Sequence, residues 1–207
     1  LNPQPYRSRF DSMKKLLAIL YLVLLSVHSY SQGVIPGVET VTRDGLVYHQ
    51  LSTEPLTEAV VSFYDNGQLL SRGNFKDGEY DGLYEEFYEN GELSERGTYI
   101  DGEFDGLFET FHENGQLSSR ENWIDGERDG LEENFGQNGQ LFRRSNYIDG
   151  LQDGLVEIFH KNGQLQYRGN YTNGLQDGVH DFFDEDGNLT QTRTFRNGVL
   201  VEENTNP

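Results

Sequence analysis

The chain has 207 residues, with 16 lysine and arginine residues against 35 aspartate and glutamate residues, and a net charge of −19. This acidity argues against a nucleic-acid-binding protein, which needs a basic surface, and against electrostatic docking on anionic lipid. The sequence contains no cysteine, which removes disulfides, thiolate metal sites and a cysteine nucleophile from consideration.

The first 31 residues have the pattern of a secretory signal peptide. Met13 is followed by two lysines and then by the apolar run 16–27, which would span about 18 Å as a helix, too short for a membrane core of roughly 30 Å. Serines at the −3 and −1 positions predict cleavage before Gln32. We expect translation to start at Met13 and the product to be periplasmic or extracellular. The alternatives are a buried core helix and an uncut membrane anchor. Cleavage would leave 12 basic and 34 acidic side chains, a net charge of −22.

From residue 59 to residue 198 the sequence repeats every 24 residues, in six copies without insertion or loss. Each copy has a glycine after Asn or Asp, a leucine two residues later and a phenylalanine four residues earlier. The columns are Gly67, Gly91, Gly115, Gly139, Gly163 and Gly187; Leu69, Leu93, Leu117, Leu141, Leu165 and Leu189; and Phe63, Phe87, Phe111, Phe135, Phe159 and Phe183. Because all six copies keep these residues, we interpret the columns as structural.

Each copy predicts two strands and two turns. In the unit 81–104, alternation of side chains indicates strands, and Glu89-Asn90-Gly91 predicts a three-residue loop with the glycine left-handed. That loop places Phe87 opposite Leu93. One face of the unit is expected to carry Leu83, Phe87, Leu93, Glu95, Gly97 and Tyr99.

Consecutive hairpins of this kind predict an all-β fold. We expect an elongated, curved, single-layer antiparallel β-meander built from six 24-residue hairpin repeats. The predicted organisation is a leader at 1–31, an N-terminal cap at 32–58, the repeats at 59–198, and a final strand with a tail at 199–207.

The opposite face varies between the copies, and specificity for a partner could lie there. Exposed aromatic and histidine side chains suit a protein contact, which makes Tyr84, Tyr88, Phe108 and His112 candidate partner-binding residues. The alternative is that these side chains only pack along the sheet.

A column of arginines and a series of acidic turns are two further candidates for function. The arginines, one repeat apart, could bind an anionic ligand or, as we favour, pair with neighbouring glutamates; they are Arg72, Arg96, Arg120, Arg144 and Arg168. Turns such as Asp101, Glu103 and Asp105 share part of the pattern of a calcium loop, but its twelfth-position glutamate is absent. We expect a solvated acidic edge, no metal and no cofactor.

The repeat pattern DGLxEexFxeNGqLxxRgxYxdG, over residues 59–198, resembles the variant MORN repeat family of bacteria. The resemblance implies elongated antiparallel sheets of consecutive hairpins. Some bacterial proteins with this repeat are YwqK-type antitoxins, which neutralise a toxin, and eukaryotic MORN repeats are associated with membrane attachment and scaffolding. Asp186 and Thr192 are mild departures from the pattern in the last copy.

Catalysis has little support, because the sequence lacks a nucleophile-elbow motif and a phosphate-binding loop. We therefore expect an exported, acidic, non-enzymatic repeat protein that acts as a protein-binding scaffold, with a protein partner that could be basic. The alternative is an immunity or antitoxin-type protein that neutralises a basic toxin; a third possibility is a cell-envelope hydrolase.

Overall fold

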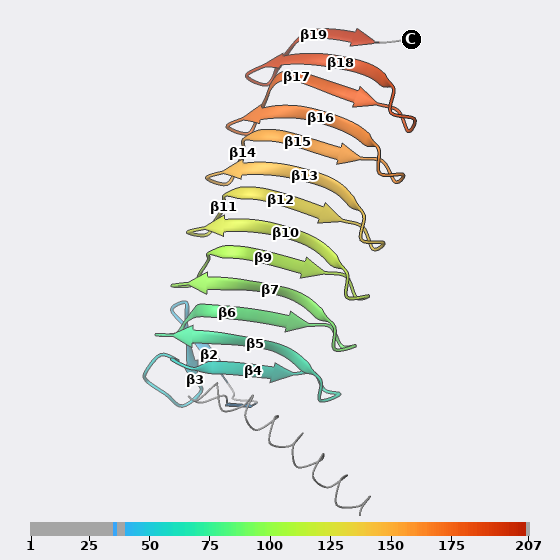
Figure 1. The fold of residues 1–207 in the computed structure, drawn as a ribbon. Helices are drawn as coiled ribbons and strands as arrows, with labels where there is room; N and C mark the ends of the chain where they lie inside the picture. Colours follow the sequence, from blue (N-terminus) through green and yellow to red (C-terminus); the bar gives the residue numbers. More distant parts are fainter. Residues whose placement is uncertain (1–34, 37–39, 206–207) are drawn as a thin grey trace, which may run out of the picture.

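The computed structural model describes residues 35–36 and 40–205, and the regular structure in these ranges consists of β-strands alone (Figure 1). From residue 59 to residue 205 the strands follow one another in chain order, so that this part of the chain is a curved ribbon one sheet thick. The predicted all-β meander of hairpin repeats is confirmed. The predicted leader, with its cleavage site before Gln32, lies outside the described residues.

Most of the described strands form one 17-stranded sheet. Its strands in the first three repeats are β4 (Ala59–Phe63), β5 (Leu69–Lys76), β6 (Glu79–Phe87), β7 (Leu93–Ile100), β8 (Glu103–Phe104), β9 (Gly106–Phe111) and β10 (Leu117–Ile124). The next repeats contribute β11 (Glu127–Arg128), β12 (Gly130–Phe135), β13 (Leu141–Ile148), β14 (Leu151–Gln152), β15 (Gly154–Phe159), β16 (Leu165–Thr172), β17 (Leu175–Phe183), β18 (Leu189–Arg196) and β19 (Val199–Thr205).

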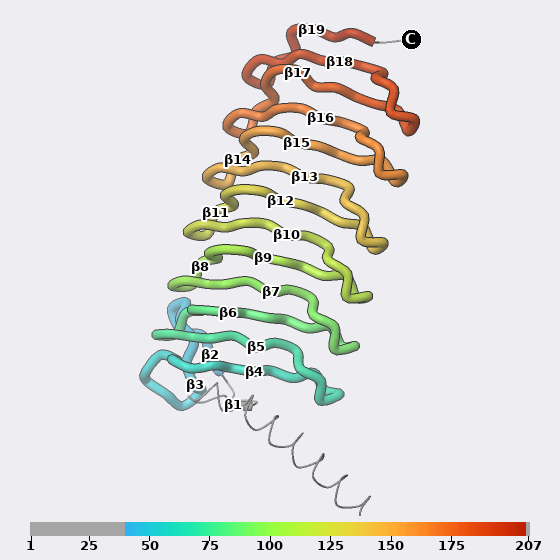
Figure 2. Tube along the Cα trace, in the orientation of Figure 1, coloured from blue at the N-terminus to red at the C-terminus, as the bar shows by residue number. Residues whose placement is uncertain are grey.

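Two kinds of connection alternate along the ribbon and form its two long edges (Figure 2). At the turn edge, two-residue turns such as Asp77-Gly78 have φ of 51° and 88°, as in the type I′ turn that matches strand twist. At the hairpin edge, three-residue loops such as 89–91 end on a glycine with φ of 87°. Phe87 then lies opposite Leu93, as predicted from the loop.

The predicted sharing of faces is wrong beyond Leu93. Glu86 pairs with Glu95 and Phe87 with Leu93, so one extra residue forms a β-bulge that reverses the alternation of side chains. Arg96, not Glu95, therefore shares a face with Glu85 and Phe87. We call the side that carries the arginine column the ion-pair face. The other side, which carries Gly97, Tyr99 and Tyr84, is the ring face.

The repeats are also joined through their turns. The amide of each turn glycine donates to a carbonyl of the preceding repeat, as Gly102 N does to Tyr80 O at 2.9 Å. The first such bond runs from Gly78 to Leu56, which is 2 % exposed. Segment 53–56 therefore takes the place of a preceding repeat and caps this end of the ribbon.

The ends of the sheet differ. At the N-terminal end, β1 (Ile35–Pro36) pairs parallel with β4, and β2 (Thr40–Arg43) and β3 (Leu46–His49) form a separate hairpin. At the C-terminal end, β19 pairs with β18 and occupies most of the segment 199–207 that was predicted as a final strand with a tail. Among the described residues, no helix is long and apolar enough to span a bilayer.

Candidate interaction surface

The ring face of the first three repeats is filled by a continuous stack of aromatic rings. Phe75 packs on Tyr80 with ring centroids 4.3 Å apart, and Tyr80 packs on Tyr99 at 5.0 Å. Tyr99 packs on Phe104 at 4.3 Å, and Phe104 on Trp123 at 5.4 Å. Burial among these rings raises the pKa of Tyr99 to about 12. The stack holds successive strands together on this side of the single layer.

The candidate partner residues Tyr84 and Phe108 belong to this packed face. Tyr84 meets Tyr80 edge-on at 5.3 Å, and Phe108 meets Phe104 at 4.7 Å. Each covers a glycine of the neighbouring strand: a Cβ on Gly97 would lie 2.6 Å from Phe108. Both side chains are half-buried, and burial followed by a hydrogen bond to Glu86 raises the pKa of Tyr84. Their variation between copies therefore reflects packing, while a role in partner binding stays a prediction.

Farther along the ribbon, the column of Tyr84 and Phe108 contains His180, which also packs against a glycine of the neighbouring strand. His180 lies opposite Gly169, where a Cβ would come within 2.3 Å of the imidazole Nδ1. His180 is 0 % exposed; it receives the Tyr167 hydroxyl on Nδ1 at 2.6 Å and bonds Asn170 O through Nε2 at 2.9 Å. Burial lowers the pKa of His180. Large side chains thus occur where the adjoining strand supplies glycine.

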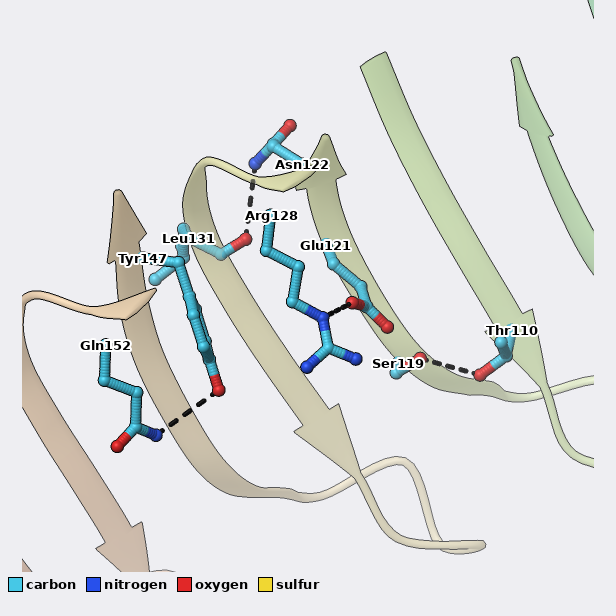
Figure 3. Close-up of polar contacts among 8 residues, drawn as sticks. All are labelled: Thr110, Ser119, Glu121, Asn122, Arg128, Leu131, Tyr147 and Gln152. Carbon is cyan, nitrogen blue, oxygen red and sulfur yellow. Dashed lines mark hydrogen bonds and ion pairs between the residues drawn. The ribbon is translucent and has the colours of Figure 1, made fainter. Parts of the chain in front are cut away.

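At the centre of the ring face, charged residues replace the rings (Figure 3). Arg128 bonds Glu121 at 2.5 Å, and its guanidinium lies 5.3 Å from the Trp123 ring and 5.6 Å from the Tyr147 ring. Burial by itself lowers the pKa of Arg128, but Glu121 and then Glu132 outweigh burial and raise it. Glu132 is 7 % exposed, and its Oε2 has no hydrogen-bond partner among the described residues.

The other two candidate partner residues, Tyr88 and His112, act between repeats. Tyr88 donates its hydroxyl to Phe111 O at 2.6 Å, and His112 Nε2 bonds Phe135 O at 2.9 Å. Both are half-buried, and each reaches a strand of the next repeat. The four candidates lie along neighbouring repeats, but each already has a packing or hydrogen-bonding role within the chain.

On the ion-pair face, the arginines pair with acidic residues of the next repeat, as we favoured. Arg96 bonds Glu109 at 2.6 Å and Arg120 bonds Glu133 at 2.5 Å. The glutamates are buried, whereas the arginines are about half exposed, at 48 % and 49 %. The other pairs are Arg72–Glu85, Arg144–Glu157 and Arg168–Asp181. The column is thus a ladder of charge pairs between repeats.

Around these pairs the ion-pair face exposes many aliphatic side chains. One column directly follows the second Asp-Gly pair of each repeat, such as Asp81-Gly82, and another directly precedes each two-residue turn. Together with their cross-strand neighbours, the exposed residues are Leu83, Ile100, Leu107, Ile124, Leu131, Ile148, Leu151, Leu155, Leu175 and Val179. We call these residues the aliphatic surface. A hollow of about 310 Å³ opens between Leu83 and Leu107, above Arg96 and Glu109. No second layer of the described chain covers this surface (Figure 1).

The aliphatic surface is bordered by acid along the turn edge. A second hollow, of about 290 Å³, is lined by Ile124, Asp125, Glu127, Asp129 and Asp149. In the first repeat, Lys76 stands in the column of Ile124 and lies 3.6 Å from both Asp81 and Asp101. Within the described chain, the four carboxylates around Ile124 have no such lysine or arginine partner. This edge combines exposed apolar side chains with uncompensated negative charge.

The aliphatic surface was not predicted from the sequence. Leu83 was expected only to share a face with Phe87, which indicates nothing about its exposure. The available signal was the isoleucine column at the turns, Ile100, Ile124 and Ile148, where the first repeat has a lysine. An aliphatic side chain beside a polar type I′ turn indicates exposure, because a single-layer sheet has nothing to cover it.

Comparison with solved structures gives only weak likenesses. A mutant of S. aureus TarM in complex with fondaparinux, α-GlcNAc-glycerol and UDP superposes with a TM-score of 0.30 and 11 % identity; 64 % of this chain and 23 % of that chain are covered. A GtfA/B complex bound to UDP and GlcNAc gives a TM-score of 0.19 and 13 % identity, over 77 % of this chain and 28 % of that chain. The chain spans about a quarter of these proteins.

No curated protein matches the sequence. The MORN repeat variant model matches five consecutive segments, residues 59–77, 80–101, 104–125, 128–149 and 152–173. These segments correspond to the stacked hairpins of the first five repeats, with their paired arginines, glycine turns and aromatic stack. The chain belongs to the MORN repeat variant family.

Proposed function

We propose that the protein is an exported, non-enzymatic scaffold that binds a basic protein through its ion-pair face. Repeats of this family are generally protein-binding or scaffold repeats. The observation that carries the proposal is the aliphatic surface, a row of exposed leucine and isoleucine side chains that no second layer of the described chain covers. Exposed apolar surface of this extent in a folded domain is typical of an interaction site.

The charge around that surface supports a basic partner. Asp125, Glu127, Asp129 and Asp149 surround the exposed Ile124 at the turn edge. Complementary charge of this kind steers a partner and fixes its orientation, while aliphatic contacts supply the apolar centre of an interface. Exposed charges are screened beyond about 8 Å at physiological salt, so binding should weaken as salt increases.

Affinity capture from a native cell-envelope fraction tests the proposal. The wild type is compared with a triple variant, Ile100→Thr, Ile124→Thr and Ile148→Thr, because Thr172 occupies the same column in the fifth repeat. A control removes exposed side chains at the hairpin loops of the second and third repeats by Glu89→Ala and Glu113→Ala. We expect the threonine variant to lose the partner and the control to retain it. A threonine variant that keeps the same partner, with no effect of salt, would contradict the proposal.

A second variant tests the candidates from the sequence. The triple change Tyr84→Ala, Tyr88→Ala and Phe108→Ala removes the side chains assigned to partner binding. Because these side chains stack and bond within the chain, we expect loss of stability first. Loss of partner in a variant that remains folded by circular dichroism would instead assign the interface to the ring face.

Export is tested separately. Mass spectrometry of the native protein should find a chain that begins at Gln32. A chain that still carries residues 16–27 would exclude cleavage and with it a soluble exported form.

The acidic turn edge also favours the antitoxin or immunity alternative, in which the basic partner is a toxin. Capture of a protein whose toxic activity is lost in the complex would support this alternative. Retention of the partner's own activity in the complex would support the scaffold.

A further inference from the structure

A column of side chains at the hairpin edge ties each repeat to the next. In each case a side chain directly after the repeat phenylalanine bonds the main-chain carbonyl of the phenylalanine one repeat later. The pairs are Tyr64 to Phe87 O at 2.7 Å, Tyr88 to Phe111 O at 2.6 Å, His112 to Phe135 O at 2.9 Å and His160 to Phe183 O at 2.9 Å. We call these side chains the struts. They show that this position accepts a tyrosine or histidine ring.

The fourth repeat has no strut, because Gly136 occupies the position. No side chain of the described chain therefore donates to the Phe159 carbonyl. A second bond is also missing at this junction. Asn90 and Asn114 each donate to a carbonyl of the next hairpin, at 2.9 and 2.8 Å, whereas Asn138 instead donates to Gln140 within its own hairpin, at 3.3 Å.

The absent strut leaves a hollow of about 340 Å³ between the two hairpins. It is lined by Gly136 and Asn138 on one side and by Phe159, His160 and Lys161 on the other, with Phe142 as a further wall. Phe142 is 46 % exposed, and the same position holds serine in the second and third repeats. The hollow therefore combines aromatic walls with the acceptor that a strut would use.

We propose that this hollow, the Gly136 notch, binds the side chain of a tyrosine from the partner protein. The phenol ring takes the place of the missing strut beside Phe142, and its hydroxyl donates to the Phe159 carbonyl, as Tyr64 and Tyr88 do to the equivalent carbonyls. Tyrosine is frequent at the centre of interfaces because it buries a large rigid ring and still makes a hydrogen bond. The proposal rests on the proposed function only for the source of the tyrosine.

The notch itself is tested with p-cresol, the side chain of tyrosine, added to the isolated chain and followed by NMR. We expect binding in the millimolar range, with shifts confined to the amides of Asn138, Phe159 and Lys161. Toluene, which lacks the hydroxyl, should bind at least tenfold more weakly. Absence of p-cresol binding, shifts spread over the ribbon, or equal binding of toluene would each overturn the assignment.

Two variants make the test specific. Gly136→Tyr and Gly136→His supply the strut from within the chain and should abolish p-cresol binding while raising the melting temperature. The Cβ would lie 3.0 Å from Asn138 Oδ1, so only a small shift of that amide is needed. Conversely, Tyr88→Gly should lower the melting temperature and create a second site, with p-cresol restoring part of the loss. Unchanged p-cresol binding by both Gly136 variants would place the ligand elsewhere.

The partner is then tested with the same variants. Affinity capture by Gly136→Tyr should recover at least tenfold less partner than the wild type. If p-cresol binds at the notch but Gly136→Tyr captures the partner normally, the tyrosine of the partner is excluded and the scaffold function stands. If the partner is never captured, the scaffold function fails, and the p-cresol result still decides whether the notch binds a phenol.

Discussion

Adjacent glutamates Glu132 and Glu133 offer a direct test of the two faces. Both are 7 % exposed, and they point to opposite sides of β12. On the ion-pair face, the Glu133 carboxylate bonds Arg120 at 2.5 Å. On the ring face, Glu132 lies opposite Ser145; its Oε2 has no hydrogen-bond partner within the described chain, and its charge acts on Arg128 without a hydrogen bond. Equal burial with unequal pairing predicts opposite effects of the same substitution.

In each variant the glutamate is changed to valine. Valine already occupies a buried site in the Glu132 column, because Val156 lies one repeat later and is 3 % exposed. A buried polar atom without a partner costs about 1–3 kcal/mol, so Glu132→Val should stabilise the protein by an amount within that range. A hydrogen bond to a charged group contributes about 1.5–3 kcal/mol. Glu133→Val should destabilise the protein near the lower end, because Arg120 is 49 % exposed and remains solvated when its partner is lost.

Urea denaturation followed by circular dichroism measures both effects. Repeat arrays do not always unfold in a single step, so midpoints and slopes are compared at each transition. The double variant shows whether the two changes add, as expected for side chains on opposite faces. If Glu132→Val destabilises the protein as much as Glu133→Val, the Glu132 carboxylate is paired in solution, and the reasoning from the ring face is refuted.

Three further predictions concern single side chains. Tyr88→Phe removes one strut hydrogen bond and should lower the free energy of unfolding, measured by urea denaturation, by about 0.5–1.5 kcal/mol. An unchanged urea midpoint would contradict this prediction. Phe111→Ala removes a ring opposite Leu117 and beneath the Arg96 guanidinium at 5.6 Å. Phe111→Ala should lower the free energy of unfolding more than Tyr88→Ala does, by up to about 3–5 kcal/mol. Equal losses of stability in the two variants would refute the inferred difference in packing. Burial lowers the pKa of His180, so the unfolded chain takes up the proton first. The stability from neutral His180 is complete above about pH 6.5 and is lost as pH falls below it. Urea midpoints at about pH 7.5 and about pH 5.5 should therefore fall more for the wild type than for His180→Val; equal falls would show that His180 is not the group.

The local structure of each repeat was determined by the sequence. Asp-Gly pairs specify type I′ turns, because both residues must adopt positive φ, as Asp77 and Gly78 do. The loop at Gly91 sets the pairing of Phe87 with Leu93. Once both turns are specified in every copy, consecutive strands pair in order, and an elongated antiparallel meander follows. The favoured pairing of the arginine column also followed from the sequence, since each arginine recurs beside a column of carboxylates.

The two faces were decided only by the tertiary structure. The bulge between Leu93 and Glu95 reverses the alternation of side chains. It arises from the geometry of the hairpin, and no residue type at this position indicates a bulge in the sequence. That reversal placed Tyr84 and Phe108 over glycines of a neighbouring strand, in a packed stack. It also left the leucine and isoleucine columns on the uncovered face. The Gly136 notch required the structure as well, because a strut joins residues 23 positions apart, and only the fold brings Phe159 O to the place where its donor is missing.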